Sequence, residues 1–115
     1  MKYLLMIYDD ENVRHGLQGA AREALHAGYM TLVKDLGAAY LGGAPLKRTS
    51  TAKSVRVRDG KTQITDGPFA ETREQLGGYF LVEAGSYEEA AKVAERMPGA
   101  KLGTIEIRPL ADVPA

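Results

Sequence analysis

The chain has 115 residues, no cysteine and equal numbers of acidic and basic side chains, so its formal net charge at neutral pH is zero. This length suits a single domain over residues 1–115, large enough to fold without a metal or a disulfide. The lack of cysteine excludes disulfides, thiolate nucleophiles and cysteine-ligated zinc, and the balanced charge argues against a nucleic-acid partner.

The chain begins with an apolar stretch, residues 2–8, that predicts a strand. Its two alternating faces are both apolar, and they carry Tyr3, Leu5 and Ile7 on one side and Leu4, Met6 and Tyr8 on the other. A strand with one wet face would alternate with polar residues, so this one should lie mid-sheet with both faces covered. The stretch is too short to span a membrane and lacks a signal-peptide cleavage site, so we expect a cytoplasmic protein with no membrane partner.

Two segments have helical periodicity. Apolar residues recur at intervals of three and four over residues 20–36, and Gly37 is a natural stop because it tolerates the left-handed conformation. A second helix is predicted after Ser86, with Glu89 completing a capping box. Residues 11–19 contain two glycines and are predicted to form a loop or a weak first turn.

A β-hairpin is the clearest local prediction. Residues 54–58 and 61–65 flank Asp59-Gly60, a pair that suits a two-residue type I′ turn in which both residues have positive φ. In this register Val55 lies opposite Ile64. One face of the hairpin is then apolar and the other polar.

Short strands are also predicted at residues 39–42, 77–83 and 104–108, with a loose tail after Pro109. The order is strand, helix, short strand, hairpin, strand, helix, strand. It predicts an α+β fold, a ferredoxin-like antiparallel sheet with two helices on one face plus the hairpin. The opposite apolar face would be exposed in a monomer, which predicts a homodimer formed by two sheets face to face.

One longer motif carries a resemblance to a known family. Residues 65–79, Thr-Asp-Gly-Pro-Phe-Ala-Glu-Thr-Arg-Glu-Gln-Leu-Gly-Gly-Tyr, resemble the motif of the DGPF branch of YCII-related proteins. Residues 1–8, 41–46 and 103–109 are similar to other parts of that family, so the likeness covers nearly the whole chain. The resemblance implies a dimeric α+β barrel.

The resemblance also implies a chemistry. Relatives in the wider family use a His–Asp pair for elimination or isomerisation of small unsaturated acids, with the histidine in the first helix ahead of a tyrosine. His26, three residues before Tyr29, matches that histidine. The partner aspartate has no clear counterpart, since Asp35 follows His26 by only nine residues.

The residues themselves leave two interpretations open for each candidate catalytic group. His26 borders the apolar stripe of its helix, where it is either a general base or a boundary residue without a role. Asp66 leaves a strand just before Gly67-Pro68. Its carboxylate either forms an Asx-turn with backbone amides or points into a pocket beside His26.

The candidate binding residues are equally ambiguous. Glu71 and Glu74 are either an acid and base pair or partners of nearby arginines. Phe69 either seals the loop onto the core or stacks on a ligand, and Tyr8 is either a buried aromatic residue or a pocket wall.

Two functions remain as hypotheses. The two histidines lack the spacing of metal ligands, and no glycine-rich phosphate loop is present, so we expect neither a metal nor a cofactor. The first hypothesis is a cofactor-independent enzyme of lyase or isomerase type that transfers protons on a small organic acid. The alternative is a non-catalytic dimeric module that binds a metabolite or a protein.

Overall fold

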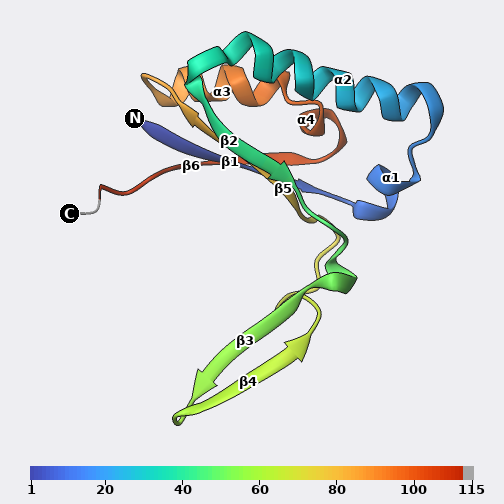
Figure 1. Cartoon of the computed structure of the whole chain (residues 1–115), viewed down its shortest axis with the longest axis vertical. Helices are drawn as coiled ribbons and strands as arrows, with labels where there is room; N and C mark the ends of the chain where they lie inside the picture. Colours follow the sequence, from blue (N-terminus) through green and yellow to red (C-terminus); the bar gives the residue numbers. More distant parts are fainter. Residues whose placement is uncertain (113–115) are drawn as a thin grey trace.

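A computed structural model describes residues 1–112 and contains a four-stranded antiparallel sheet (Figure 1). Its strands are β1 (Lys2–Asp9), β2 (Tyr40–Pro45), β5 (Gln75–Glu83) and β6 (Thr104–Pro109), in the order β2-β5-β1-β6. The apolar first strand pairs with β5 on one side and β6 on the other, so it lies mid-sheet as predicted. The predicted α+β class is confirmed.

Three helices cover one face of this sheet (Figure 1). They are α2 (Gly19–Leu36), α3 (Tyr87–Arg96) and the short α4 (Gly99–Leu102), with a 3-10 turn η1 (Gly37–Ala39) after α2. Gly37 ends α2 with φ +53° and ψ −125°, a positive-φ conformation that glycine adopts more readily than other residues. At the start of α3, the Ser86 hydroxyl accepts a hydrogen bond from the Glu89 backbone N–H at 3.2 Å, which confirms the predicted N-cap. The Glu89 carboxylate accepts one from Gly85 N–H rather than from Ser86.

The segment after β1 differs from its prediction. It forms a short helix, α1 (Glu11–Gly16), instead of a loop or weak turn. The Asp10 carboxylate caps it by accepting a hydrogen bond from the Asn12 N–H at 3.0 Å, with Glu11 in the first turn and Arg14 in the last. Both charges suit the helix dipole. The cap and the charges therefore outweigh the glycines that suggested a loop.

The core lies between the sheet and its helices. It is built from Tyr3, Leu5, Ile7, Leu32, Phe80, Val82, Ala84, Ala90 and Met97. The alternate β1 residues Leu4, Met6 and Tyr8 point to the face without helices and are only half-buried. Both faces of β1 were predicted to be covered. Within the chain, the helices cover only the face that carries Tyr3, Leu5 and Ile7.

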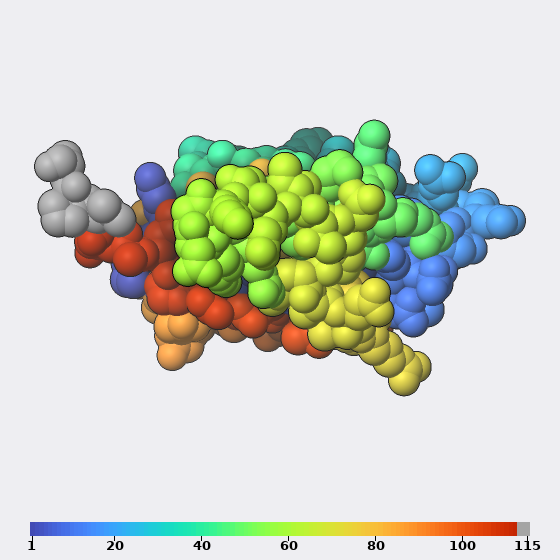
Figure 2. All heavy atoms as spheres, turned by 90° about the horizontal axis from the view of Figure 1, so that it is seen from below, coloured from blue at the N-terminus to red at the C-terminus, as the bar shows by residue number. Residues whose placement is uncertain are grey.

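A separate two-stranded hairpin projects from this body (Figure 1), and Figure 2 views the molecule from the side on which it projects. We call it the arm, residues 53–66, composed of β3 (Lys53–Arg58) and β4 (Lys61–Asp66) and joined to β2 through the 3-10 turn η2 (Thr49–Thr51). Val55 pairs with Ile64 as predicted. Asp59 and Gly60 have φ +53° and +73°, as a type I′ turn requires.

The end of the chain is described only in part. The Leu110 N–H donates a hydrogen bond to the Lys2 carbonyl at 2.9 Å, so the chain just past Pro109 is attached to β1 rather than loose. The rest of the predicted tail, residues 113–115, lies outside the described residues. Within residues 1–112 no helix has the length and apolar character needed to cross a membrane.

Candidate active site

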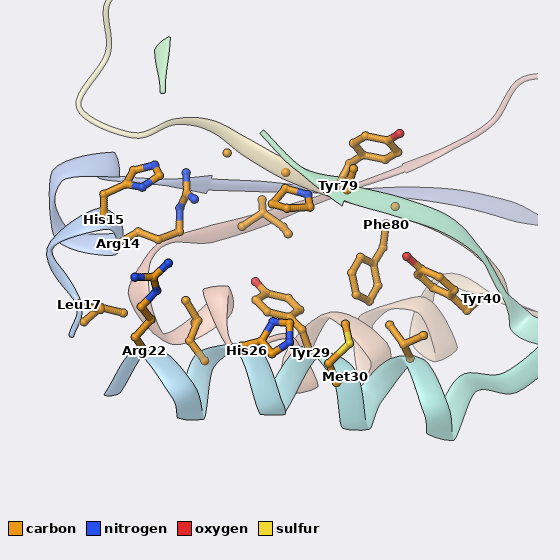
Figure 3. Close-up of a pocket in the computed structure, with 18 residues that line it drawn as sticks. Arg14, His15, Leu17, Arg22, His26, Tyr29, Met30, Tyr40, Tyr79 and Phe80 are labelled. Carbon is orange, nitrogen blue, oxygen red and sulfur yellow. The ribbon is translucent and has the colours of Figure 1, made fainter. Parts of the chain in front are cut away.

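A cavity of about 480 Å³ lies between α1, α2 and the β2–β5 edge of the sheet (Figure 3). Its volume is within the range of small-molecule sites. Aromatic and aliphatic side chains form most of the wall, and four basic residues also line it, namely Arg14, His15, Arg22 and His26. The cavity therefore combines an apolar interior with groups that attract an anion.

A buried ion pair holds the first of these basic residues. The Arg14 Nε donates to the Asp9 Oδ2 at 2.7 Å, and the Asp9 side chain is only 1% exposed. Burial raises the pKa of Asp9, although the adjacent Arg14 acts in the opposite direction. The two terminal nitrogens of Arg14 have no hydrogen-bond partner within residues 1–112. Arg14 is thus fixed through Nε and keeps its remaining donors for a ligand.

Glycines make room for this pair and for the cavity. A Cβ on Gly77 would lie 2.6 Å from Nη2 of Arg14 and 3.0 Å from Oδ1 of Asp9. On the neighbouring strand, a Cβ on Gly43 would lie 2.5 Å from the Tyr79 carbonyl oxygen. A side chain at residue 77, within the DGPF-like motif, would therefore displace the end of Arg14.

Helix α2 contributes two further polar groups. Arg22 and His26 are one helical turn apart and extend toward the cavity in Figure 3. Both are exposed, so they lie at its mouth rather than in its interior. His26 is therefore accessible to a ligand and to water.

Two other titratable groups line the cavity. The pKa of His15 on α1 is lowered by burial and by the nearby Arg14 and Arg48, so the neutral form is favoured. The Tyr29 hydroxyl accepts a hydrogen bond from the Gly99 N–H at 3.0 Å, and burial raises its pKa. Tyr29 therefore keeps its proton near neutral pH.

The structure does not bring Asp66 to His26 within one chain. Asp66 ends β4 with its side chain 86% exposed, and its carboxylate pairs with the Lys53 ammonium at 2.5 Å. This ion pair is neither the Asx-turn nor the contact with His26 that the sequence left open for Asp66. A catalytic role for Asp66 stays a prediction that no contact within residues 1–112 supports.

The other predicted binding residues lie away from the cavity. Tyr8 and Phe69 line a second groove of about 510 Å³ at the base of the arm. Phe69 is 82% exposed, so it does not seal the loop onto the core. Within residues 1–112, Glu71 and Glu74 pair with no arginine, and Glu74 instead accepts a hydrogen bond from the Thr104 hydroxyl.

Sequence reasoning did not propose a role for three residues that line the cavity, Arg14, His15 and Arg22, or for Asp9, which holds Arg14 in place. Arg14 and His15 were predicted to lie in a loop or a weak turn. Without a regular element, the sequence does not indicate which way their side chains point. The signal that points to them is Asp10, a good N-cap directly after a strand, followed by an acidic first turn. Recognising α1 would have directed attention to its last turn and to the carboxylate at the end of β1.

Comparison with known proteins agrees with the motif. The model of the YCII-related domain matches residues 1–114. The chain belongs to this family. A relative in Rhizobium meliloti (strain 1021), the uncharacterised protein R00369, is 36% identical over 105 residues, which cover 90% of this chain and 77% of that protein.

A solved structure has the same fold. It is the 5-chloro-2-hydroxyhydroquinone dehydrochlorinase TftG from Burkholderia phenoliruptrix AC1100, in complex with 2,5-dihydroxybenzoquinone. The TM-score is 0.56 and the identity 16%, with 96% of this chain and 94% of that chain covered. At this identity the likeness establishes the fold alone.

Proposed function

We propose that this YCII-related protein binds a small organic acid in the cavity and catalyses a proton transfer on it, of lyase or isomerase type and without a cofactor. The observation that carries the proposal is Arg14, fixed by the buried Asp9 and lining the same cavity as His26. One group can hold a developing negative charge and the other can accept a proton. Carbon-acid chemistry needs these two groups.

The chemistry follows from their positions. His26 takes the proton from a carbon beside the substrate carbonyl, and the electron pair of that bond moves to the carbonyl oxygen. Arg14 stabilises the resulting oxyanion with donors that are already fixed in place. In an elimination the electron pair then expels a leaving group from the next carbon, and in an isomerisation the proton returns at another carbon.

Charge and polarity around the cavity support an acidic ligand. Arg14 and Arg22 both line it, and the Asp9 carboxylate beside Arg14 is already paired with that arginine. Aromatic walls from Tyr29, Tyr40 and Phe80 suit a flat unsaturated compound. The dehydrochlorinase of similar fold removes a halide, which is compatible with elimination chemistry.

A non-catalytic binding module is the second candidate. It is favoured by the exposure of His26 at the mouth of the cavity. A metabolite would then bind through the same arginines without turnover. The two candidates share the ligand class and differ in what His26 does.

We also propose a homodimer in which a second copy covers the helix-free face of the sheet. The half-buried β1 residues on that face, Leu4, Met6 and Tyr8, support it, since monomers rarely expose large apolar patches. A cytoplasmic location stays a prediction, supported by the cysteine-free composition.

A thermal denaturation screen against small organic acids, lactones and enols tests the ligand class. A ligand at a hundred times its dissociation constant should stabilise the protein by about 2.7 kcal/mol. Arg22→Gln should weaken that ligand about tenfold, because it removes an exposed cation at the mouth of the cavity.

Turnover of the compound found in this way then separates the two candidates. Under the enzyme proposal, His26→Gln lowers turnover by roughly 10²- to 10⁴-fold while the ligand still binds. Binding without any turnover in the natural protein would favour the module. If neither Arg22→Gln nor Arg14→Met changes the stabilisation by any hit, the cavity is not the ligand site.

A further inference from the structure

The arm has an apolar face that nothing covers within residues 1–112. Val55, Val57 and Ile64 share this face and are 61%, 59% and 65% exposed. The opposite face carries Arg56, Arg58, Lys61 and Gln63. Residues 55–58 alternate strictly between valine and arginine, and Thr62 lies opposite Val57 on the apolar face. Such alternation is typical of a strand with one face buried.

The register of the arm fixes which face is apolar. A slip of one residue would exchange the two faces, and the type I′ turn at Asp59-Gly60 prevents that slip. An isolated two-stranded hairpin is marginally stable in water. The arm therefore combines a well-specified apolar face with little packing of its own to support it.

The exposed area of the whole chain exceeds what a compact monomer requires. The surface is 8121 Å² for a mass of 12.4 kDa. A compact monomer of this mass exposes about 6,100 Å². The excess is larger than the roughly 800 Å² that each partner buries in an interface of standard size. The radius of gyration, 16.1 Å, likewise exceeds the roughly 13 to 14 Å of a compact chain of this length.

We propose that the arm of each chain packs its apolar face against a second copy of the chain. The inference rests on the homodimer proposed above and adds the arm to its interface. The groove at the base of the arm is lined by Tyr8 and Leu76, which are paired neighbours on β1 and β5. Tyr8 also belongs to the helix-free face, so the groove at the base of the arm adjoins that face.

Two-fold symmetry explains how a second copy can cover both the helix-free face of the sheet and the apolar face of the arm. A two-fold dimer uses the same patches twice, so each arm covers its partner while its own body is covered in return. One association then buries the helix-free face and the apolar face of the arm together. A different protein would have to match both surfaces separately.

Two adjacent residues give a matched test. Ile64→Glu places a charge on the apolar face of the arm, and Gln63→Glu places the same charge on its polar face. Sedimentation equilibrium over a range of protein concentrations measures the dimer dissociation constant. We expect Ile64→Glu to raise it at least tenfold and Gln63→Glu to change it less than twofold. Both residues are exposed in the single chain, so neither change threatens folding.

Amide hydrogen exchange over residues 53–66 is the second measurement. The arm amides should exchange at least tenfold more slowly in the dimer than in Ile64→Glu at the same protein concentration. A dimer of unchanged affinity in both variants, with fast exchange in the arm, overturns the arm proposal and leaves the dimer intact. A natural chain that stays monomeric at every concentration overturns both proposals. An arm protected only by a different protein overturns the arm proposal alone.

Discussion

The body and the arm are built from the same local pattern and differ in what lies against it. In β1 and β5 the residues facing the helices, such as Leu5 and Val82, are fully buried. In the arm Val55 and Ile64 have the same alternation and the same cross-strand pairing, yet remain mostly exposed. A period of two therefore predicts a strand and its apolar face, while the cover must come from another part of the chain or from another chain.

The largest difference concerns buried charge, which occurs in the body and not in the arm. Arg14→Met would leave the Asp9 carboxylate buried without its partner, which we expect to lower the free energy of unfolding by roughly 3 to 5 kcal/mol at pH 8. Arg22→Met is the matched control, because Arg22 is exposed and should change stability by less than about 0.5 kcal/mol.

The pH dependence of that loss has a defined sign. Burial raises the pKa of Asp9 in the folded protein, and removing Arg14 removes the interactions that oppose this rise. A carboxyl group with a raised folded-state pKa stabilises the fold below its unfolded-state pKa, and this contribution is lost as the pH rises through the folded-state pKa. Urea unfolding between pH 8 and pH 4 should therefore show the deficit of Arg14→Met shrinking as the pH falls. A deficit that does not vary with pH would mean that Asp9 is not its cause.

Apolar side chains give a second comparison of the two regions. Leu5→Ala creates a cavity in the core, and we expect it to lower the free energy of unfolding by roughly 2 to 5 kcal/mol. Ile64→Ala should change it by less than about 0.5 kcal/mol at a protein concentration where the chain is monomeric. Urea unfolding at one low concentration measures both. Equal losses would mean that the arm is packed within a single chain.

Two glycines extend the comparison to the backbone. In the body, Gly77→Ala would bring a Cβ to 2.6 Å from the end of the Arg14 side chain, which must move. We expect a stability loss of roughly 1 to 3 kcal/mol and at least a tenfold weaker affinity for the organic acid found in the ligand screen. Gly16→Ala is the control, because a Cβ there meets nothing within 4 Å. An unchanged affinity in Gly77→Ala would mean that Arg14 does not contribute to binding the ligand.

In the arm, Gly60→Ala acts through conformation instead. Gly60 has φ +73°, where an L-residue costs roughly 1 to 2 kcal/mol. Because the arm is joined to the body only at its base, we expect faster amide exchange within residues 53–66 and an unchanged unfolding midpoint of the monomeric body. The control is Lys61→Ala, an exposed neighbour with ordinary backbone angles. A parallel fall of the midpoint would show that arm and body unfold together.

The same contrast explains how much the sequence predicts. Elements with a strong local signal, such as the hairpin with its Asp59-Gly60 turn and the helix capped by Ser86, are found where expected. Among the site residues, His26 lines a cavity, while Asp66 is exposed on the arm. Whether two polar residues meet depends on where distant elements pack, and periodicity carries no information about that. The Asp9–Arg14 pair was missed for the same reason, since it requires α1 to fold back over the end of β1.

The smallest expected effect concerns Asp66 itself. Asp66→Asn removes a surface ion pair with Lys53 whose side chains are 86% and 67% exposed, and such pairs contribute little to stability. We expect a change below about 0.5 kcal/mol in urea unfolding and no change in affinity for the ligand of the cavity. Lys53→Met is the control, because it removes the same ion pair and keeps the Asp66 carboxylate. If Asp66→Asn weakens the ligand and Lys53→Met does not, the carboxylate must act at a cavity outside its own chain. The arm would then contribute to the site of a second copy, and the distinction between a functional body and a purely structural arm would be lost.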